Sequence, residues 1–157
     1  MGSEMCIRDR NNHIRQIATA AKRLDMSIDY ADNHALFIES AQWLGVPYRG
    51  GGRSKRGVDC SGLTKCIYKN VYDIELSPSS QLQLDRDINR RVRKKHLKQG
   101  DLVFFSERKS ARRISHVGIY LKDGKFLHAS SKRGVRIDYL DDQYWRRRWI
   151  IGGRILK

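Results

Sequence analysis

The sequence predicts an α+β fold, in which helices come first and an antiparallel sheet of about five to six strands follows. Apolar residues recur at helical spacing in the first half of the chain. The segments after Gly100 are instead short, rich in β-branched and aromatic residues, and separated by glycines. A length of 157 residues with 39% hydrophobic positions suits one ordinary domain. We therefore expect one compact core, with helices packed on a face of the sheet.

Two helices open the predicted domain. Their apolar positions recur at helical spacing from Ile14 to Leu24 and again from Leu36 to Leu44, where Gly45 ends the second run. Residues 1–12 are predicted to be a flexible or non-native tail, because no periodic pattern marks this stretch. The domain itself is expected to span residues 13–157.

A glycine-rich loop at residues 46–57 separates these helices from the next one. The loop does not end in Gly-Lys-Ser or Gly-Lys-Thr, so it is not a phosphate-binding loop. Leu63, Ile67 and Val71 follow one another at helical spacing, which predicts a helix that begins near Cys60. Cys60 is thus expected at the N-terminal end of that helix.

The rest of the chain is predicted to be mostly strands. A short polar helix around residues 80–86 comes first, and the basic segment up to Lys98 is expected to be loop with a short strand. Strands are then predicted at residues 102–106, 116–121, 125–130, 135–139 and 149–156.

The charge of the chain indicates the kind of partner but not the chemistry. Lysine and arginine number 32 against 17 acidic residues, which gives a net charge of +15. Such a charge attracts nucleic acid, anionic lipid and phosphate- or carboxylate-bearing wall polymers alike. The basic residues are dispersed and no nucleic-acid-binding motif accompanies them, so we do not expect a nucleic-acid partner. No apolar run reaches the roughly 20 residues that a membrane-spanning helix needs.

Cys60 is the candidate nucleophile. With Cys6 and Cys66 it forms no paired set, so neither a disulfide framework nor a zinc site is predicted. A thiol attacks as the thiolate, and a helix N-terminus or a nearby imidazole would favour that form. The alternative is that Cys60 is only a small buried residue. Its polar neighbours Asp59 and Ser61 instead favour an accessible turn.

His116 and His128 lie on two predicted strands that Asp123-Gly124 connects. A two-residue turn would place the histidines on opposite faces of the hairpin, whereas a three-residue loop that also includes Lys122, with a bulge at Gly124, would place them on the same face. The second register also gathers the aliphatic residues on one side, so hydrophobic segregation favours it. The imidazoles are then diagonal neighbours, with backbones roughly 7 to 8 Å apart. A coincidental polar pair and half of a metal site are the alternatives.

Five motifs resemble, in their order and spacing, the NlpC family of cell-wall cysteine peptidases. They are Pro47-Tyr48 with the glycine loop, Asp59-Cys60-Ser61-Gly62-Leu63, Gly100-Asp101-Leu102-Val103-Phe104-Phe105, His116-Val117-Gly118-Ile119-Tyr120 and Phe126-Leu127-His128-Ala129-Ser130. The resemblance covers about residues 36–155. It implies a papain-like α+β fold, with the nucleophile helix packed on the sheet. It also implies cleavage of peptidoglycan stem peptides between γ-D-glutamate and the diamino acid, meso-diaminopimelate or lysine.

The resemblance also implies roles for single residues. Cys60 would be the nucleophile, His116 the general base that later acts as an acid, and His128 the residue that orients His116. The oxyanion would be stabilised by the backbone N–H of Cys60 and by Tyr48, for which a packed aromatic or a loop anchor is an equal alternative. Neither a metal nor a cofactor is implied.

Asp59 and Ser61 resemble the pair with which the family meets its substrate, and Asp59 also suits a helix cap. Two basic stretches depart from the family pattern, the loop at residues 49–57 and the cations of residues 108–113. Both are candidates for contact with stem-peptide carboxylates or wall polyphosphates.

The leading hypothesis is a metal-independent cysteine peptidase of peptidoglycan, with electrostatic contact to anionic wall polymer. We expect it in the periplasm, in the cell envelope or among secreted proteins, with its leader absent from this chain. One alternative is a basic module that binds wall polymer or nucleic acid and whose cysteine is inert. Another is a papain-like acyltransferase.

Overall fold

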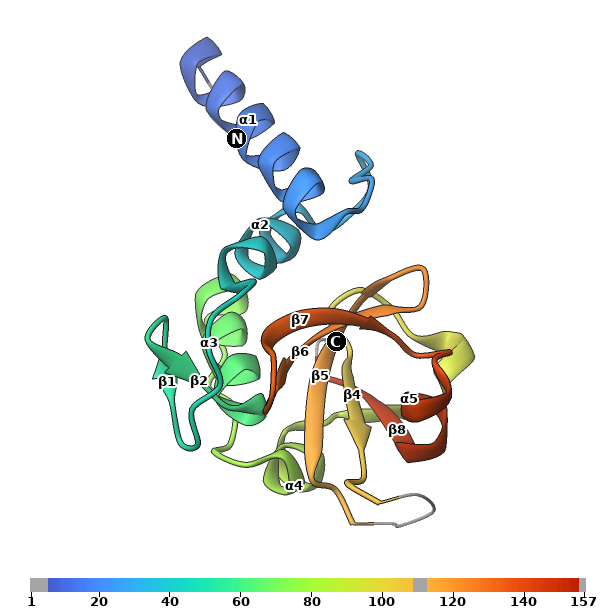
Figure 1. Ribbon diagram of the computed structural model, residues 1–157. Helices are drawn as coiled ribbons and strands as arrows, with labels where there is room; N and C mark the ends of the chain where they lie inside the picture. Colours follow the sequence, from blue (N-terminus) through green and yellow to red (C-terminus); the bar gives the residue numbers. More distant parts are fainter. Residues whose placement is uncertain (1–5, 109–112, 156–157) are drawn as a thin grey trace.

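The protein was analysed as a computed structural model, which describes residues 6–108 and 113–155. A six-stranded antiparallel sheet with the order β3-β8-β4-β5-β6-β7 forms its centre (Figure 1). The strands are β3 (Arg90–Val92), β4 (Leu102–Phe105), β5 (His116–Lys122), β6 (Lys125–Ser130), β7 (Gly134–Tyr139) and β8 (Trp149–Arg154). A separate ribbon pairs β1 (Arg53–Ser54) with β2 (Gly57–Val58). The predicted α+β class and the strands after Gly100 are confirmed.

The main helices precede the large sheet in the chain. They are α1 (Ile7–Leu24), α2 (His34–Trp43) and α3 (Cys60–Tyr72), and shorter helical segments follow at α4 (Ser80–Leu82), η1 (Gln83–Asp87), η2 (Lys94–His96) and α5 (Gln143–Arg148). Helix α1 packs on α2, α2 packs on α3, and α3 packs against β5 and β6, so α1 projects farthest from the sheet (Figure 1). Of the helices in the described ranges, none combines the length and apolarity needed to cross a membrane.

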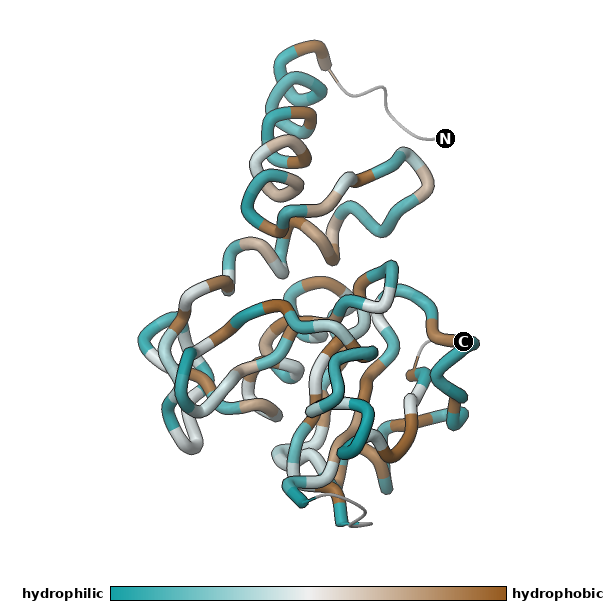
Figure 2. Tube along the Cα trace, turned by 45° about the vertical axis from the view of Figure 1, so that its right-hand side comes forward, coloured by the Kyte–Doolittle hydropathy of each residue, from teal (hydrophilic) through white to brown (hydrophobic). Residues whose placement is uncertain are grey.

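The N-terminal segment differs from its prediction. Helix α1 begins at Ile7, so residues 7–12, expected to belong to a tail, are helical. Most side chains of the first turns are exposed, and the first buried ones are Ala20 and Leu24. Figure 2 shows the hydrophilic colour that dominates this helix. Because these turns bury almost nothing, they carry no apolar periodicity from which a helix could be predicted. The tail residues 1–5 lie outside the described ranges.

The sheet carries a hydrophobic core on each face. On one face α3 covers the sheet and α2 packs on α3, and Phe37, Leu63, Ile67, Val117 and Ile119 of this core are all 0% exposed. The other face carries a smaller cluster of Val103, Phe105, Phe126 and Leu140, surrounded by partly buried aromatic residues. The first cluster anchors helix α3 on the sheet, and the second forms the floor beneath the histidines of the hairpin.

The β5–β6 hairpin has the face assignment that hydrophobic segregation predicts. Ile119 pairs with Leu127, so Gly118 lies opposite His128 and the side chains of His116 and His128 share one face. The aliphatic side chains point to the opposite face, toward α3. The prediction of a shared face is confirmed.

The turn of this hairpin is different from the predicted three-residue loop. Lys122 pairs with Lys125, so the turn contains only Asp123 and Gly124, whose φ angles are 54° and 76°. Two left-handed residues are typical of a type I′ turn. The extra residue lies instead in β5, where the register shifts between Tyr120 and Lys122. A bulge within the strand therefore keeps the histidines on one face despite the tight turn.

Candidate active site

Cys60 is the first residue of α3, as predicted. Asp59 caps this helix, because its Oδ1 accepts a hydrogen bond from the Gly62 N–H at 2.7 Å. The Asp59 Oδ2 accepts another from the Gly51 N–H at 2.8 Å, which ties the glycine-rich loop to the helix start. Cys60 is partly buried and lines a pocket of about 660 Å³. Its sulfur is therefore neither sealed in the core nor fully exposed.

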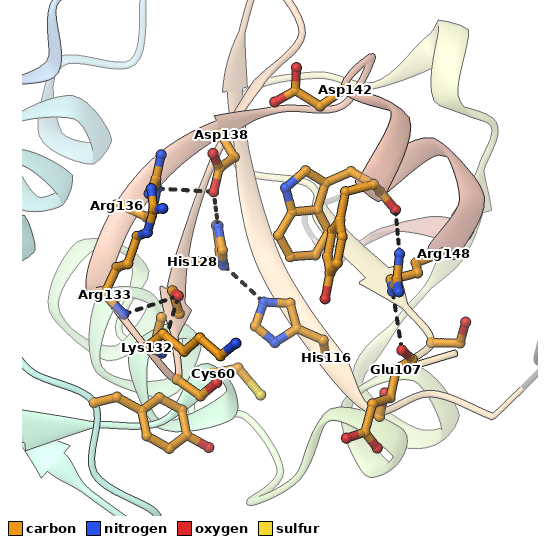
Figure 3. Close-up of a pocket in the computed structure, with 18 residues that line it drawn as sticks. Cys60, Glu107, His116, His128, Lys132, Arg133, Arg136, Asp138, Asp142 and Arg148 are labelled. Carbon is orange, nitrogen blue, oxygen red and sulfur yellow. Dashed lines mark hydrogen bonds and ion pairs between the residues drawn. The ribbon is translucent and has the colours of Figure 1, made fainter. Parts of the chain in front are cut away.

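His116 and His128 form a hydrogen-bonded pair in the same pocket. The distance between Nε2 of His116 and Nδ1 of His128 is 2.9 Å, and the two rings are nearly perpendicular, at 83°. Cys60 also lines this pocket, and Figure 3 shows its side chain beside the His116 ring. The structure thus brings together the three residues for which catalytic roles are predicted.

Asp138 completes this hydrogen-bonded chain and has no counterpart in the sequence prediction. Its Oδ2 lies 2.6 Å from Nε2 of His128 and 3.2 Å from Nε of Arg136 (Figure 3). Arg136 and Asp138 lie two residues apart in β7, so their side chains point to the same side of the sheet, which is the side of the histidines. Strand β7 pairs with β6. The only sequence signal for them was the alternation of charged residues in that strand. Within residues 6–108 and 113–155, no three His, Cys, Asp or Glu side chains form a group suited to a metal ion.

The hydrogen-bonded chain determines which ring nitrogens carry protons. An ionised carboxylate only accepts, so Nε2 of His128 donates to Asp138. In a neutral His128 ring, Nδ1 then accepts, and the donor is Nε2 of His116. In a neutral His116 ring, Nδ1 is left without a proton. Asp138 therefore orients the imidazole pair so that His116 can accept a proton at Nδ1.

Burial changes the pKa of all three predicted catalytic groups. It lowers the pKa of His116, and the neighbouring His128 lowers it further. It also lowers the pKa of His128 more than the Asp138 hydrogen bond raises it. The pKa of the Cys60 thiol is raised by burial, against the opposite effect of the Val117 backbone N–H. The resting site thus favours a neutral thiol beside neutral imidazoles, whereas the sequence predicted a favoured thiolate, because desolvation outweighs the helix N-terminus.

Trp145 of α5 covers the imidazole pair. Its ring stacks on His116 at 5.5 Å between centroids, with planes 23° apart, and meets His128 edge-on at 4.8 Å. Phe105 supports Trp145 from the sheet, at 4.8 Å. Trp145 is not among the residues predicted for the site, because the short helix α5 has no apolar periodicity that would mark it. The stacked ring restricts the orientation of His116 and shields it from water.

Tyr48 lies in the pocket, at the position expected from the sequence. It forms a bridge with Val58 and is 39% exposed. Burial, together with the nearby Cys60 and Asp59, raises the pKa of its phenol. The hydroxyl thus keeps its proton at neutral pH and can donate a hydrogen bond.

Asp59 and Ser61 do not line the pocket. Ser61 is 6% exposed, and its hydroxyl donates to the Pro78 carbonyl at 3.2 Å. The Asp59 carboxylate is engaged by the backbone N–H groups of Gly51 and Gly62. Capping by Asp59 is confirmed, and contact of either residue with substrate stays a prediction.

The described residues of the two basic stretches singled out in the sequence do not line this pocket. The loop at residues 49–57 contains the β1–β2 ribbon, and its Arg53 and Lys55 line a separate pocket next to Cys66. Of residues 108–113, Arg108 and Arg113 are exposed and do not line this pocket, and residues 109–112 lie outside the described ranges. In the part of the chain that the structure describes, the cations that line the pocket are Lys132, Arg133, Arg136 and Arg148.

Gly118 leaves room for the neighbouring His128 in the hairpin, because glycine has no Cβ. A Cβ at this position would lie 2.8 Å from the Leu127 carbonyl oxygen and 3.2 Å from the Cβ of His128. We therefore expect Gly118→Ala to lower the free energy of unfolding by about 1 to 3 kcal/mol, measured by urea denaturation. In Gly50→Ala, the matched control, the added Cβ meets no atom within 4 Å. Equal midpoints for the two variants would contradict this packing.

Because His116 and His128 are neutral in the folded protein, we expect the protein to become less stable in mild acid. The folded protein holds both imidazoles below their ordinary pKa of 6.5, so the unfolded chain binds protons first as the pH falls. Between about pH 7.5 and about pH 5.5, we expect the free energy of unfolding to fall by about 1 kcal/mol from His116, and His128 acts in the same direction. Urea denaturation at the two pH values measures it.

A matched pair of variants isolates this effect. His96 is exposed outside the pocket, so His96→Asn should keep the full pH dependence. The double variant His116→Asn/His128→Asn should flatten it. An equally steep dependence in the double variant would show that other groups cause the acid sensitivity.

Comparison with known protein families identifies a match for most of the chain. Residues 45–154 match the model of the NlpC/P60 family. A solved structure of an NlpC/P60 family protein from Bacillus cereus superposes with a TM-score of 0.72 at 32% identity, over 82% of this chain and 42% of the other.

Curated relatives point to the same family. A probable endopeptidase NlpC homolog of Haemophilus influenzae is 42% identical over 73% of this chain and 58% of its own length. A murein DD-endopeptidase MepS/murein LD-carboxypeptidase of Escherichia coli is 37% identical over 74% of this chain and 59% of its own. A γ-DL-glutamyl hydrolase of Bacillus subtilis is 37% identical over 69% of this chain and 26% of its own. The match thus spans about three-fifths of the length of the first two relatives.

Proposed function

The chain belongs to the NlpC/P60 family, and on that premise we propose that it is a cysteine peptidase that hydrolyses peptide bonds of peptidoglycan. One observation carries the proposal. A hydrogen-bonded chain from Asp138 through His128 to His116 ends in the pocket that Cys60 lines. Such an arrangement of nucleophile, base and orienting group is typical of covalent catalysis by a thiol.

The reaction begins when the Cys60 sulfur attacks the carbonyl carbon of the scissile amide. Because the resting thiol is neutral, its proton passes to Nδ1 of His116 during the attack. His116 then gives this proton to the departing amine, and the acyl group stays on sulfur as a thioester. A water molecule that loses a proton to His116 hydrolyses the thioester, and Cys60 regains its proton.

The negative oxygen of the tetrahedral intermediates needs hydrogen-bond donors. The backbone N–H of Cys60 at the start of α3 is one candidate, and the protonated phenol of Tyr48 is another. Loss of the Tyr48 hydroxyl in Tyr48→Phe is expected to lower kcat by roughly 10²-fold. A steady-state assay measures this, and an unchanged kcat would leave Tyr48 with a packing role only.

The bond that we propose is the amide between γ-D-glutamate and the diamino acid of the stem peptide. The Bacillus subtilis relative is named for hydrolysis at a γ-linked glutamyl residue, which supports this choice. The Escherichia coli relative is instead named for a DD-bond, which makes cross-link cleavage the second candidate. Mass spectrometry of digested muropeptides distinguishes them, because the first reaction releases L-Ala-γ-D-Glu and the second separates cross-linked dimers into monomers.

The same digest tests the reaction class. We expect iodoacetamide to abolish product formation and EDTA to leave it unchanged. Tight binding of wall polymer or nucleic acid without any product would favour the alternative of a basic binding module. Transfer of an acyl group to an added acceptor, with no hydrolysis, would favour a papain-like acyltransferase.

We place the protein outside the cytoplasm, in the periplasm, in the cell envelope or among secreted proteins, because peptidoglycan lies there. Its net charge of +15 supports electrostatic contact with anionic wall polymer. Sedimentation with purified walls, tested at increasing salt, measures this contact.

A further inference from the structure

Cationic residues line one side of the catalytic pocket, and they differ in the hydrogen bonds and ion pairs that their side chains make. Arg148 is committed to the fold, because its guanidinium donates to the carbonyls of Glu107 and Tyr144, each at 3.1 Å. It also lies over the Tyr144 ring at 3.6 Å. Arg136 contacts the Asp138 carboxylate, with its Nε at 3.2 Å. These two arginines thus support α5 and the Asp138 carboxylate.

Lys132 and Arg133 differ from these two arginines in their side-chain contacts. Both are exposed, both line the pocket, and neither belongs to any ion pair found in the described part of the chain. They are therefore the pocket cations that are free to meet a ligand.

The turn that carries these two residues has a defined position. Their backbone N–H groups donate to the Ser130 hydroxyl, at 3.4 Å for Lys132 and 3.2 Å for Arg133. Directly after the turn, Val135 exchanges two hydrogen bonds with the segment before Tyr48, since its N–H donates to Val46 and its carbonyl accepts from Gly45. The turn is thus tied to Ser130 at one end and to the loop that carries Tyr48 at the other.

Figure 3 shows the Lys132 side chain extending into the pocket toward His116 and Cys60. Of the three acidic residues of the described lining, Asp138 is already engaged by His128 and Arg136, and Glu107 and Asp142 lie away from Lys132 in the same view. The pocket is therefore electrostatically polarised, with positive charge beside the reacting groups on the β6–β7 side.

We propose that Lys132, with Arg133 beside it, binds a free carboxylate of the substrate next to the scissile amide and so determines specificity. The inference rests on the proposed function, which supplies a peptide substrate. An ammonium group binds a carboxylate as a compact charge from a flexible stem, so it can reach the ligand without a fixed fork geometry. Two substrate carboxylates have this chemistry. One is the α-carboxylate of the γ-linked glutamyl residue, and the other belongs to the residue that supplies the amine.

The experiment compares three stem peptides: the parent and two analogues in which one or the other carboxylate is a carboxamide. For the parent peptide, we expect Lys132→Gln to raise KM roughly 10-fold, with kcat changed by less than about twofold. One of the amidated analogues should show the raised KM already with the unaltered protein, and Lys132→Gln should add nothing further to it. That analogue identifies the carboxylate. Lys132→Arg should keep most of the affinity for the parent.

Lys95→Gln is the matched control, because Lys95 is exposed on η2 and does not line the pocket. It changes the net charge equally and should leave KM unaltered. The proposal is overturned if Lys132→Gln raises KM equally for all three peptides, or no more than Lys95→Gln does.

Calorimetry measures peptide binding without hydrolysis, so failure of this inference can be distinguished from failure of the proposed function. If the unaltered protein hydrolyses none of the peptides, the proposed function fails, and binding of the same peptides to the Cys60→Ala variant decides the inference. Binding that needs one carboxylate and is lost in Cys60→Ala/Lys132→Gln supports the inference. Absence of binding, or binding that does not depend on either carboxylate, overturns it.

Discussion

The Cys60→Ala variant is expected to lose hydrolysis of stem peptides down to the uncatalysed background, by at least roughly 10⁴-fold in kcat. Alanine removes the sulfur to which the proposed mechanism assigns the thioester, while α3 keeps its cap because the Asp59 carboxylate is untouched. The loss should therefore be chemical rather than structural. Mass spectrometry of peptide products measures it, and an unchanged urea midpoint shows that the variant is folded.

Cys66→Ala provides the matched control for this result. Cys66 also lies on α3, but its sulfur contacts the Arg53 carbonyl at 3.3 Å and lines a different pocket. Burial raises the pKa of its thiol as well, so its ionisation alone does not distinguish it from Cys60. We expect Cys66→Ala to keep nearly full activity and to remain sensitive to iodoacetamide. Substantial activity in Cys60→Ala would refute the assignment of the nucleophile.

The Asp138→Asn variant is expected to lower kcat by roughly 10² to 10⁴-fold, with a small change in KM. An asparagine amide can donate to Nε2 of His128, which favours the opposite tautomer of that ring. His128 Nδ1 would then donate to Nε2 of His116, and the proton of His116 would move to Nδ1, the atom that must accept one. In the proposed mechanism, the carboxylate acts on the reaction only through this relay, as a positioning residue.

The pH profile distinguishes this role from a purely structural one. We expect the activity of Asp138→Asn to have a different pH dependence from that of the unaltered protein, whereas Asp138→Glu, which keeps an acceptor, should recover part of the activity at neutral pH. Asp142→Asn is the matched control, since Asp142 lines the same pocket but its side chain makes no cap hydrogen bond with α5. An equal loss in Asp142→Asn, or an Asp138→Asn profile of unchanged shape, would contradict the relay.

The hairpin shows how far local reasoning reaches. The alternation of aliphatic and polar residues in β5 and β6 was enough to place His116 and His128 on one face, and the structure confirms this. The turn was predicted wrongly, because a loop bulge and a strand bulge give the same face assignment. Hydrophobic segregation predicts which face of the hairpin a side chain occupies. It does not predict whether the extra residue of the bulge lies in the loop or in the strand.

Periodicity and motif order in the sequence determined the α+β class, the start of helix α3 at Cys60 and the shared face of the two histidines. These features depend on neighbours along the chain or across a single hairpin, so a local pattern is enough to encode them. Only the tertiary structure decided that Asp138 bonds His128, that Trp145 stacks on His116, and which cations reach the pocket. Each of these contacts depends on the register of a further strand or on the docking of a short helix. Those arrangements are set by packing energies summed over the whole core, which no local pattern displays.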